Sequence, residues 1–280
     1  AQAGAPVGVI LANIAFISVS LLTSEESFLS WGWRIPFLIS FVLVIISMYI
    51  QLRLEDTKAF KELEAAKSSQ DSTKQEIKSS PILEALRRYP RRISLAAGAF
   101  LSIQVTFYIL VAFILAYGVA TTDLSRNDLL AAVLIGSAIM VPLQFYFSHY
   151  SDKNGRKGIF MAGAFLTALW SFFLFPLIDT GNFYLVILAV TGGLAFLGMM
   201  YGPQAAFFAE LFSTEVRYSG ASLGYQIGAI LGGSFAPTIA TLLWTSYDIF
   251  WVSVYIALAS AASLFSVYFL TETYKTDLNK

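Results

Sequence analysis

Few residues in this 280-residue chain could do chemistry in an apolar environment, and those few are neutral. The chain has no cysteine and one histidine, His149, so disulfides, thiolate catalysis and a multi-histidine metal or haem site are excluded. Its apolar runs carry almost no ionisable side chains, whereas acid–base catalysis in a membrane needs paired acids, histidines or a nucleophile with its base. We therefore predict no enzyme activity, no metal and no cofactor.

The polar groups inside the apolar runs are almost all neutral, and the glutamines and tyrosines among them suit hydrogen bonding to a small polar molecule. Gln104 and Tyr108 are four residues apart and share one face of a helix. Each such residue taken alone is more often an interhelical hydrogen bond than a ligand contact. With Gln104, Tyr108 and Gln226 placed first, our candidates for substrate binding are Gln104, Tyr108, Gln226, Tyr225, Gln144 and Tyr201.

The segment SDKNGRKG (151–158) places four charges between two apolar runs, in a chain that is 13% charged. Asp152 follows the carbonyl end of one expected helix, and Arg156 and Lys157 precede the amide end of the next, so both signs oppose the helix dipoles. We expect compensating partners on other helices, a positive helix start for Asp152 and a carboxylate for Arg156. The Asn-Gly pair ending at Gly155 predicts a tight turn. A simple hairpin with topogenic lysines is the alternative, and it leaves Asp152 unexplained.

The elements that must position these residues are membrane-spanning helices. The chain is 57% hydrophobic with a mean hydropathy of +0.68, which is too apolar for one soluble domain to cover with polar surface. About 20 helical residues cross a hydrocarbon core of about 30 Å. We predict an all-α integral membrane protein with eight spans, the second only just long enough: 1–22, 35–52, 93–118, 129–148, 159–178, 183–203, 219–243 and 249–270.

The basic residues test this assignment independently. If the loops alternate between two sides, 16 of the 18 Lys and Arg fall on one side, and only Arg34 and Arg126 lie opposite. The positive-inside rule makes the first side cytoplasmic, with both ends of the chain on it. The long polar segment 55–92 lies on this side, and SSQDSTKQEIKSS within it has the composition of a linker. After it, SPILEALRRYPRR predicts a short amphipathic helix on the inner membrane surface, although its basic residues alone could simply set topology.

Glycine recurs every fourth residue in the seventh run, which makes one helix face flat. The stripe consists of Gly220, Gly224, Gly228 and Gly232. Because lipid provides little hydrophobic drive between helices, close backbone approach contributes much of their association. Static packing is the simpler interpretation, and a mobile interface is the sharper hypothesis.

Three stretches together resemble a known family. The loop pattern D-x-x-G-R-K, WGWRIPFLIS (31–40) and GPQAAFFAELFSTEVRYSGASLGYQIGAILGGSFAP (202–237) resemble the major facilitator superfamily, and within it the metabolite:proton symporters that include shikimate, 2-oxoglutarate, citrate and proline/betaine carriers. The resemblance runs from Ala1 to about Thr273 and implies helices 5–12 of a twelve-helix carrier. Residues 1–54 would end the N-terminal six-helix bundle, 55–92 would be the cytoplasmic linker, and 93–280 would form the C-terminal bundle with a short tail. Four preceding helices would be missing from a truncated chain, and we expect no transport by this stretch alone.

The resemblance also implies a cytoplasmic gate. Asp152 would face the start of the fifth helix around residues 1–8, and Arg156 would pair with Glu210 or Glu215. The full set is Asp152, Gly155, Arg156, Lys157, Glu210, Glu215 and Arg217. Such a latch would hold the cytoplasmic side closed until the bundles rock. Two positions depart from the family pattern, with Ser148 where a glycine is usual and Ser213 where proline is frequent.

What the resemblance implies for function is secondary active transport of a small organic acid or zwitterionic metabolite across the inner membrane, with the proton as coupling ion. The family often carries Arg and Glu in the seventh helix where this chain has Phe100 and Ile103, so an uncoupled uniporter or an osmoprotectant carrier stays open, and a channel or scaffold is a further alternative. The partners implied are the metabolite, the bilayer and the missing helices, with no nucleic acid, in a monomeric carrier. The sequence does not predict the substrate, the stoichiometry or the oligomeric state.

Overall fold

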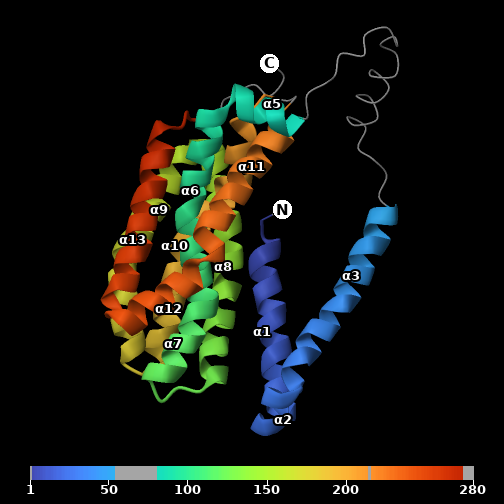
Figure 1. Cartoon of the computed structure of the whole chain (residues 1–280), viewed down its shortest axis with the longest axis vertical. Helices are drawn as coiled ribbons and strands as arrows, with labels where there is room; N and C mark the ends of the chain where they lie inside the picture. The colour runs from blue at the N-terminus through green and yellow to red at the C-terminus, as the bar shows by residue number, and fades with distance from the viewer. Residues whose placement is uncertain (1, 54–80, 214–215, 274–280) are drawn as a thin grey trace. The chain divides into compact units, whose positions relative to one another are not determined.

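The computed structural model describes residues 2–53, 81–213 and 216–273, and every regular element among them is helical (Figure 1). Eight helical stretches in these ranges are long and apolar enough to cross a membrane. Each coincides with one of the eight predicted runs, so the predicted all-α membrane architecture is confirmed. The first two spans are α1 (Gly4–Leu22) and η1 with α3 (Gly32–Arg34, Ile35–Arg53), joined by α2 (Glu25–Ser30).

The remaining six spans follow a short surface helix, α5 (Pro81–Arg88). They are α6, η2 and α7 (Pro90–Tyr108, Ile109–Phe113, Ile114–Thr121), α8 (Arg126–Asn154), α9 (Arg156–Asp179), α10 (Phe183–Glu210), α11, η3 and α12 (Arg217–Ala229, Ile230–Ser234, Ala236–Ser246), and α13 (Phe250–Phe269). The helices α8 and α10 begin at defined caps: Ser125 and Asp128 form a capping box, and Asn182 accepts the backbone N–H groups of Tyr184 and Leu185. The helix α8 extends beyond its predicted run at both ends, whereas α10 begins at the predicted residue and extends beyond its run only at the C-terminal end.

The chain divides into two compact units, and the boundary lies within α1. The smaller unit, residues 15–80, contains the second half of α1 with α2 and α3, whose side chains are exposed along almost the whole of α3. The larger unit comprises residues 1–14 and 81–280. The predicted division of the chain at residues 54 and 92 stays a prediction.

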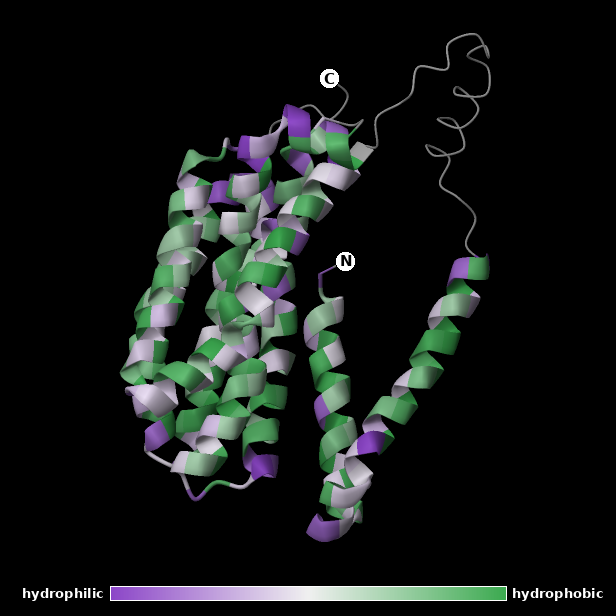
Figure 2. Cartoon of the chain, viewed as in Figure 1, coloured by the Kyte–Doolittle hydropathy of each residue, from purple (hydrophilic) through white to green (hydrophobic). Residues whose placement is uncertain are grey.

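The larger unit is a bundle with a dry aromatic core and an apolar outer surface. In it α10 packs against α8 and α9, and α13 packs against α6 and α9. The core includes the fully buried Phe100, Phe113, Phe160, Phe175 and Phe207. Hydrophilic residues gather at the two ends of the bundle, and hydrophobic ones lie between them (Figure 2). Outward-pointing apolar side chains on the spans suit contact with lipid.

Three glycines of the stripe, Gly224, Gly228 and Gly232, pack against α6 inside this bundle, whereas Gly220 lies against Phe212. A Cβ atom on Gly228 would lie 2.7 Å from the carbonyl oxygen of Ala97 and 2.8 Å from the Cβ atom of Phe100. A Cβ atom on Gly224 would lie 2.7 Å from the Cβ atom of Ala96. The stripe thus brings the two backbones into contact, which is what small residues allow between helices in a membrane.

Two spans contain a π-helical turn, η2 in the third and η3 in the seventh. Such turns are rare and occur frequently at functional sites. The two lie close to a common element, because Tyr108 directly precedes η2 and its ring contacts η3, where a Cβ atom on Gly233 would lie 2.7 Å from the Tyr108 Cε2 atom. Two of the candidate binding residues, Gln104 and Tyr108, lie where α6 meets η3.

Candidate functional site

Four of the six predicted binding residues line one pocket of about 170 Å³. We call it the tyrosine pocket, and it is lined by Ala5, Ile103, Gln104, Phe107, Tyr108, Leu197, Tyr201 and Tyr225. The lining comes from four helices: α6, α10 and α11 supply the polar side chains, and α1 supplies Ala5. The spacing of Gln104 and Tyr108 placed both on the same face of α6, as the sequence predicted.

The packing around the tyrosine pocket fixes its walls. Gly232 lets η3 approach α6, since a Cβ atom there would lie 3.0 Å from the Cβ atom of Gln104. The ring of Tyr225 lies 4.3 Å from that of Phe100, centroid to centroid, at 37°. Tyr201 is buried with 8% of its surface exposed. Three phenols and one carboxamide therefore converge on a preformed pocket with aromatic faces.

No lining residue of the tyrosine pocket carries a charge. At the two positions where the family often has Arg and Glu, Phe100 and Ile103 are buried, with 0% and 1% of their surfaces exposed. The pocket can donate and accept hydrogen bonds and can hold a cationic group against aromatic rings. Its lining offers no carboxylate or imidazole to carry a proton.

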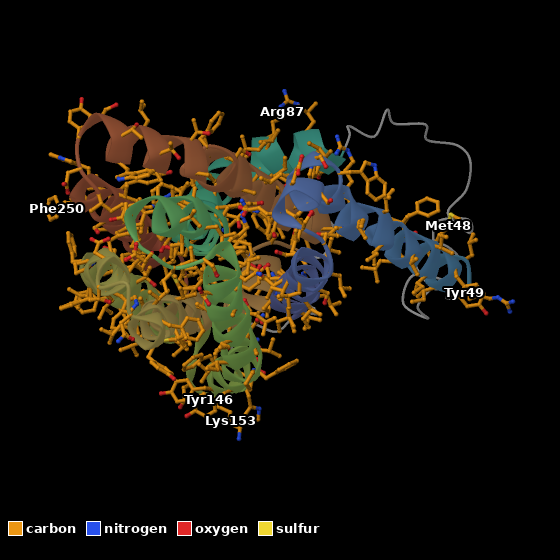
Figure 3. All side chains as sticks on the ribbon, turned by 90° about the horizontal axis from the view of Figure 1, so that it is seen from below. Met48, Tyr49, Arg87, Tyr146, Lys153 and Phe250 are labelled. Carbon is orange, nitrogen blue, oxygen red and sulfur yellow. The ribbon has the colours of Figure 1, made fainter. Side chains whose placement is uncertain are left out.

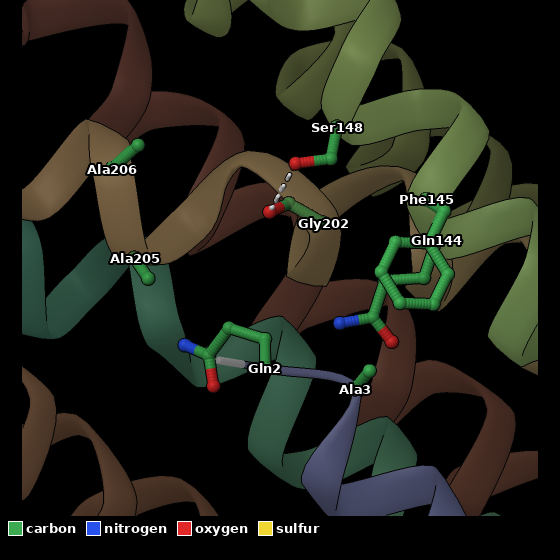
Figure 4. A pocket seen from close by; sticks show the side chains of 8 residues that line it. All are labelled: Gln2, Ala3, Gln144, Phe145, Ser148, Gly202, Ala205 and Ala206. Atoms are coloured by element: carbon green, nitrogen blue, oxygen red, sulfur yellow. Dashed lines mark hydrogen bonds between the residues drawn. The ribbon is translucent and has the colours of Figure 1, made fainter.

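The other two predicted binding residues line two other pockets, so the six candidates do not share one site. Gln226 is exposed and lines a separate pocket with Ile82, Tyr218, Ser219, Ser222 and Leu223. It follows Tyr225 directly, and consecutive residues of an α-helix point about 100° apart. Gln144 lines a third pocket, lined by Gln2, Ala3, Gln144, Phe145, Ser148, Gly202, Ala205 and Ala206, which we call the amide pocket (Figure 4).

The charged loop between α8 and α9 forms a compact cluster at one end of the bundle. Gly155 has φ of 105°, a left-handed conformation that favours glycine, and it lets α9 begin immediately after α8 ends. Arg156, 8% exposed, donates from Nη2 and Nε to the two carboxylate oxygens of Glu210, at 2.9 and 3.3 Å. This bidentate pair is one of the two alternatives that were predicted for Arg156. The other, Glu215, lies outside the described residues.

Asp152 is paired within its own loop, and the helix start that was predicted to face it stays a prediction. Its carboxylate accepts a hydrogen bond from Nη1 of Arg156, and among the described residues this is the ion pair that it forms. Arg156 follows Asp152 by four residues across the tight turn, so its guanidinium neutralises the Asp152 carboxylate within the loop. Arg217, the last member of the predicted gate, begins α11 and is partly buried.

The charges at the α8–α9 turn oppose the dipoles of their own helices, and residues that the sequence analysis missed compensate for this. The Glu272 carboxylate accepts the backbone N–H groups of Arg156 and Lys157, at 2.9 and 3.1 Å, and so places an anion at the start of α9. Lys157 in turn donates from Nζ to the carbonyl oxygens of Tyr268 and Leu270, at 2.6 and 3.0 Å, which places a cation at the end of α13. Each helix end thus receives the charge that it favours, from the other segment.

Glu210 is also held from the end of the bundle, because the Thr273 hydroxyl donates to its Oε2 atom at 2.5 Å. Hydrogen bonds and an ion pair therefore join three segments: the α8–α9 turn, the end of α10 and the segment after α13. The residues that make them are Arg156, Lys157, Glu210, Glu272 and Thr273. The signal that could have found Glu272 is its place as the first acid after the last span.

Fold and site together define a polytopic helical membrane protein with a neutral polar pocket inside a bundle. Residues 1–223 match the family described as the Major Facilitator Superfamily, so the chain belongs to this family. The predicted family is thereby confirmed, as is the prediction that the chain is not an enzyme.

Individual relatives agree with this assignment. The chain is 35% identical over 280 residues to the inner membrane metabolite transport protein YhjE of Escherichia coli (strain K12), covering 97% of this chain and 61% of that protein. It is 34% identical to the shikimate transporter of the same organism, covering 92% and 58%. It is 25% identical to the glycine betaine/proline/ectoine/pipecolic acid transporter OusA of Dickeya dadantii (strain 3937), covering 96% and 54%. The chain thus spans about 60% of the length of the first two relatives.

A solved structure shows the same fold. The crystal structure of a D-xylose-proton symporter superposes with a TM-score of 0.66 at 17% sequence identity, covering 99% of this chain and 63% of that one.

Proposed function

We propose that this chain forms part of a secondary transporter that moves a small organic acid or zwitterionic metabolite across the inner membrane by alternating access. The observation that carries the proposal is the tyrosine pocket, in which Gln104, Tyr108, Tyr201 and Tyr225 converge without a charged residue. Its volume of about 170 Å³ suits a small metabolite. The names of the relatives, which include a metabolite transport protein and a shikimate transporter, support the same class.

The lining of the tyrosine pocket suits both proposed substrate classes. Phenol O–H and carboxamide N–H groups donate to a carboxylate, and the faces of Tyr108, Tyr201 and Tyr225 are attractive surfaces for an ammonium group. Neutral donors bind an anion more weakly than an arginine would, which suits a carrier that must also release its substrate. The pocket therefore supports an organic acid or a zwitterion.

We propose the proton as coupling ion, on the strength of the family resemblance. Uniport is the second candidate, because Phe100 and Ile103 are apolar and buried where relatives often have an ion pair. Substrate uptake measured together with pyranine-reported proton movement in proteoliposomes separates the two. Proton entry in step with substrate supports symport, and uptake without it establishes a uniporter.

We propose further that the Arg156 cluster closes the cytoplasmic end, with Asp152, Gly155, Lys157, Glu210, Glu215 and Arg217 taking part and both chain ends on that side. The bidentate bond of Arg156 to Glu210 supports a latch that holds the α8–α9 turn on α10. Asp152→Asn should shift the balance between inward-facing and outward-facing forms, as measured by distance distributions between spin labels. An unchanged ratio together with unchanged transport would discard the gate.

The binding role is tested by removing one polar group at a time, a hydroxyl from Tyr201 or the carboxamide of Gln104. In cells expressing the complete reading frame that contains this chain, Tyr201→Phe and Gln104→Leu should each raise the KM for uptake about tenfold, which corresponds to one lost hydrogen bond. Tyr247→Phe removes the same group from a residue that is 74% exposed, beyond the pocket, and should leave the KM unchanged. Unaltered KM values for the two pocket variants at normal expression would exclude the tyrosine pocket as the substrate site.

A further inference from the structure

The amide pocket, whose lining Figure 4 shows, has a volume of about 200 Å³. Both pockets border α10, where Tyr201 lines the first and Gly202, Ala205 and Ala206 line the second. The amide pocket therefore extends one to two helical turns further toward the charged end of α10 at Glu210. A solute that leaves the tyrosine pocket in that direction passes it.

One wall of the amide pocket is held rigidly. The backbones of α8 and α10 nearly touch, since a Cβ atom on Gly202 would lie 2.8 Å from the carbonyl oxygen of Gln144 and 3.2 Å from the amide nitrogen of Ser148. The Ser148 hydroxyl donates to the carbonyl oxygen of Gly202 at 3.3 Å, as Figure 4 shows. Ser148 is the position where the family usually has glycine, so this chain adds a polar group to the wall.

The carboxamides of Gln2 and Gln144 line this pocket, and Gln2 is paired with Gln204 behind the lining. Gln204, 1% exposed, accepts a hydrogen bond at Oε1 from the Gln2 side chain. Gln144, 4% exposed, has its Oε1 atom buried and without a hydrogen-bond partner among the described residues. A buried acceptor left unpaired costs about 1–3 kcal/mol. The site therefore favours an occupant that brings a hydrogen-bond donor to Gln144.

We infer that the amide pocket is a second polar site for the transported solute, and that it recognises a hydroxyl or other N–H or O–H donor through Gln144. The inference rests on the proposed function and narrows its substrate class. A small hydroxylated acid such as shikimate carries such donors, whereas glycine betaine, whose nitrogen is fully methylated, carries none. No lining residue of the pocket is charged, so the discrimination follows from hydrogen bonding alone.

The experiment uses the absence of cysteine from this chain, with any cysteine elsewhere in the complete protein replaced by serine. A single Ala206→Cys substitution in the complete protein places a thiol on the pocket wall, and its alkylation by N-ethylmaleimide is followed with and without solute. Shikimate at millimolar concentration should slow alkylation about fivefold or more, and glycine betaine should not. Adding Gln144→Met, an apolar side chain of similar size, should raise the shikimate concentration for half-protection about tenfold. Ala209→Cys, one turn along α10 and outside the pocket, is the matched reporter whose alkylation neither solute should change.

Three results would overturn the inference: equal protection by both solutes, protection by neither, as expected if the pocket holds only water, or protection that survives Gln144→Met. The comparison of the two solutes needs no change at Gln144, so it stands even if that variant folds poorly. Uptake measured in parallel separates the two hypotheses. Saturable uptake without protection contradicts the second site alone, while absence of uptake contradicts the transport function.

Discussion

Arg156 binds two carboxylates in different surroundings. Its bidentate partner Glu210 has a side chain that is 13% exposed, whereas that of Asp152 is 54% exposed and that of Arg156 itself 10%. Water and salt screen an exposed ion pair, so it contributes little to stability. Loss of one member of a buried pair leaves a desolvated charge behind, which costs much more. The two contacts should therefore differ in energy although they share one guanidinium.

Double-mutant cycles test this difference. With Arg156→Gln, Glu210→Gln and Asp152→Asn, we expect a coupling energy of about 1–3 kcal/mol for Arg156–Glu210 and below about 1 kcal/mol for Arg156–Asp152. The measurement is reversible unfolding in mixed micelles. Lys153→Gln combined with Glu210→Gln is the control, since Lys153 projects away from the bundle, and its cycle should be additive (Figure 3). Equal coupling energies for the two pairs would contradict the assignment from burial.

At this scale the sequence predicted some contacts and missed others for definite reasons. Arg156 needed a carboxylate, and the resemblance restricted the choice to two, of which Glu210 is the one observed. For Asp152 we expected a partner on another helix, because an argument from helix dipoles considers only helix ends. It does not show that the long side chain of Arg156 can fold back across the turn at Gly155 to Asp152. Glu272 was missed because its role depends on where α13 ends in space, which spacing along the chain does not give. Gln226 was grouped with Tyr225 although adjacent helical residues face different surroundings.

Among the elements, α11 and α6 approach each other closely at Gly228, with backbone as well as side-chain atoms in the contact. Gly228→Ala would force a methyl group against the backbone of Ala97 and the side chain of Phe100. We expect a loss of about 1–3 kcal/mol in the free energy of unfolding, as is typical of overpacking. Gly198→Ala on α10 is the control, because the nearest atom, Cγ of Met140, lies 3.6 Å from the added carbon. That variant should be neutral or slightly stabilising, since alanine favours helix over glycine.

Thermal unfolding in detergent gives both values. A Gly228→Ala variant as stable as Gly198→Ala would mean that α6 and α11 separate easily, and would favour the mobile interface over fixed packing.

The eight spans themselves could be predicted, because length and hydropathy alone decide what crosses a bilayer. The π-helical turns η2 and η3 could not, since ILVAF and ILGGS carry no local pattern that separates them from α-helix.

At the scale of the larger unit, the ends of the bundle differ in charge. One end carries α5, the α8–α9 turn with Lys153, Arg156 and Lys157, and the Glu272 contact, while the α7–α8 connection with Asp123 lies at the other (Figure 1). The positive-inside rule then assigns the Lys153 end to the cytoplasm. This follows from the distribution of basic residues rather than from net charge, which is zero.

Labelling from the two sides of the membrane tests that orientation. Because the chain has no cysteine, Lys153→Cys and Asp123→Cys each introduce a single thiol. An impermeant maleimide added to intact cells should label Asp123→Cys and should reach Lys153→Cys only after permeabilisation, while the unsubstituted protein stays unlabelled. The reverse pattern would invert the topology, and labelling of both thiols from one side would contradict the odd number of crossings that α8 requires between residues 123 and 153. An inverted topology would also place the Arg156 cluster on the outer face. The orientation of the bundle therefore decides whether this cluster can act as the proposed cytoplasmic latch.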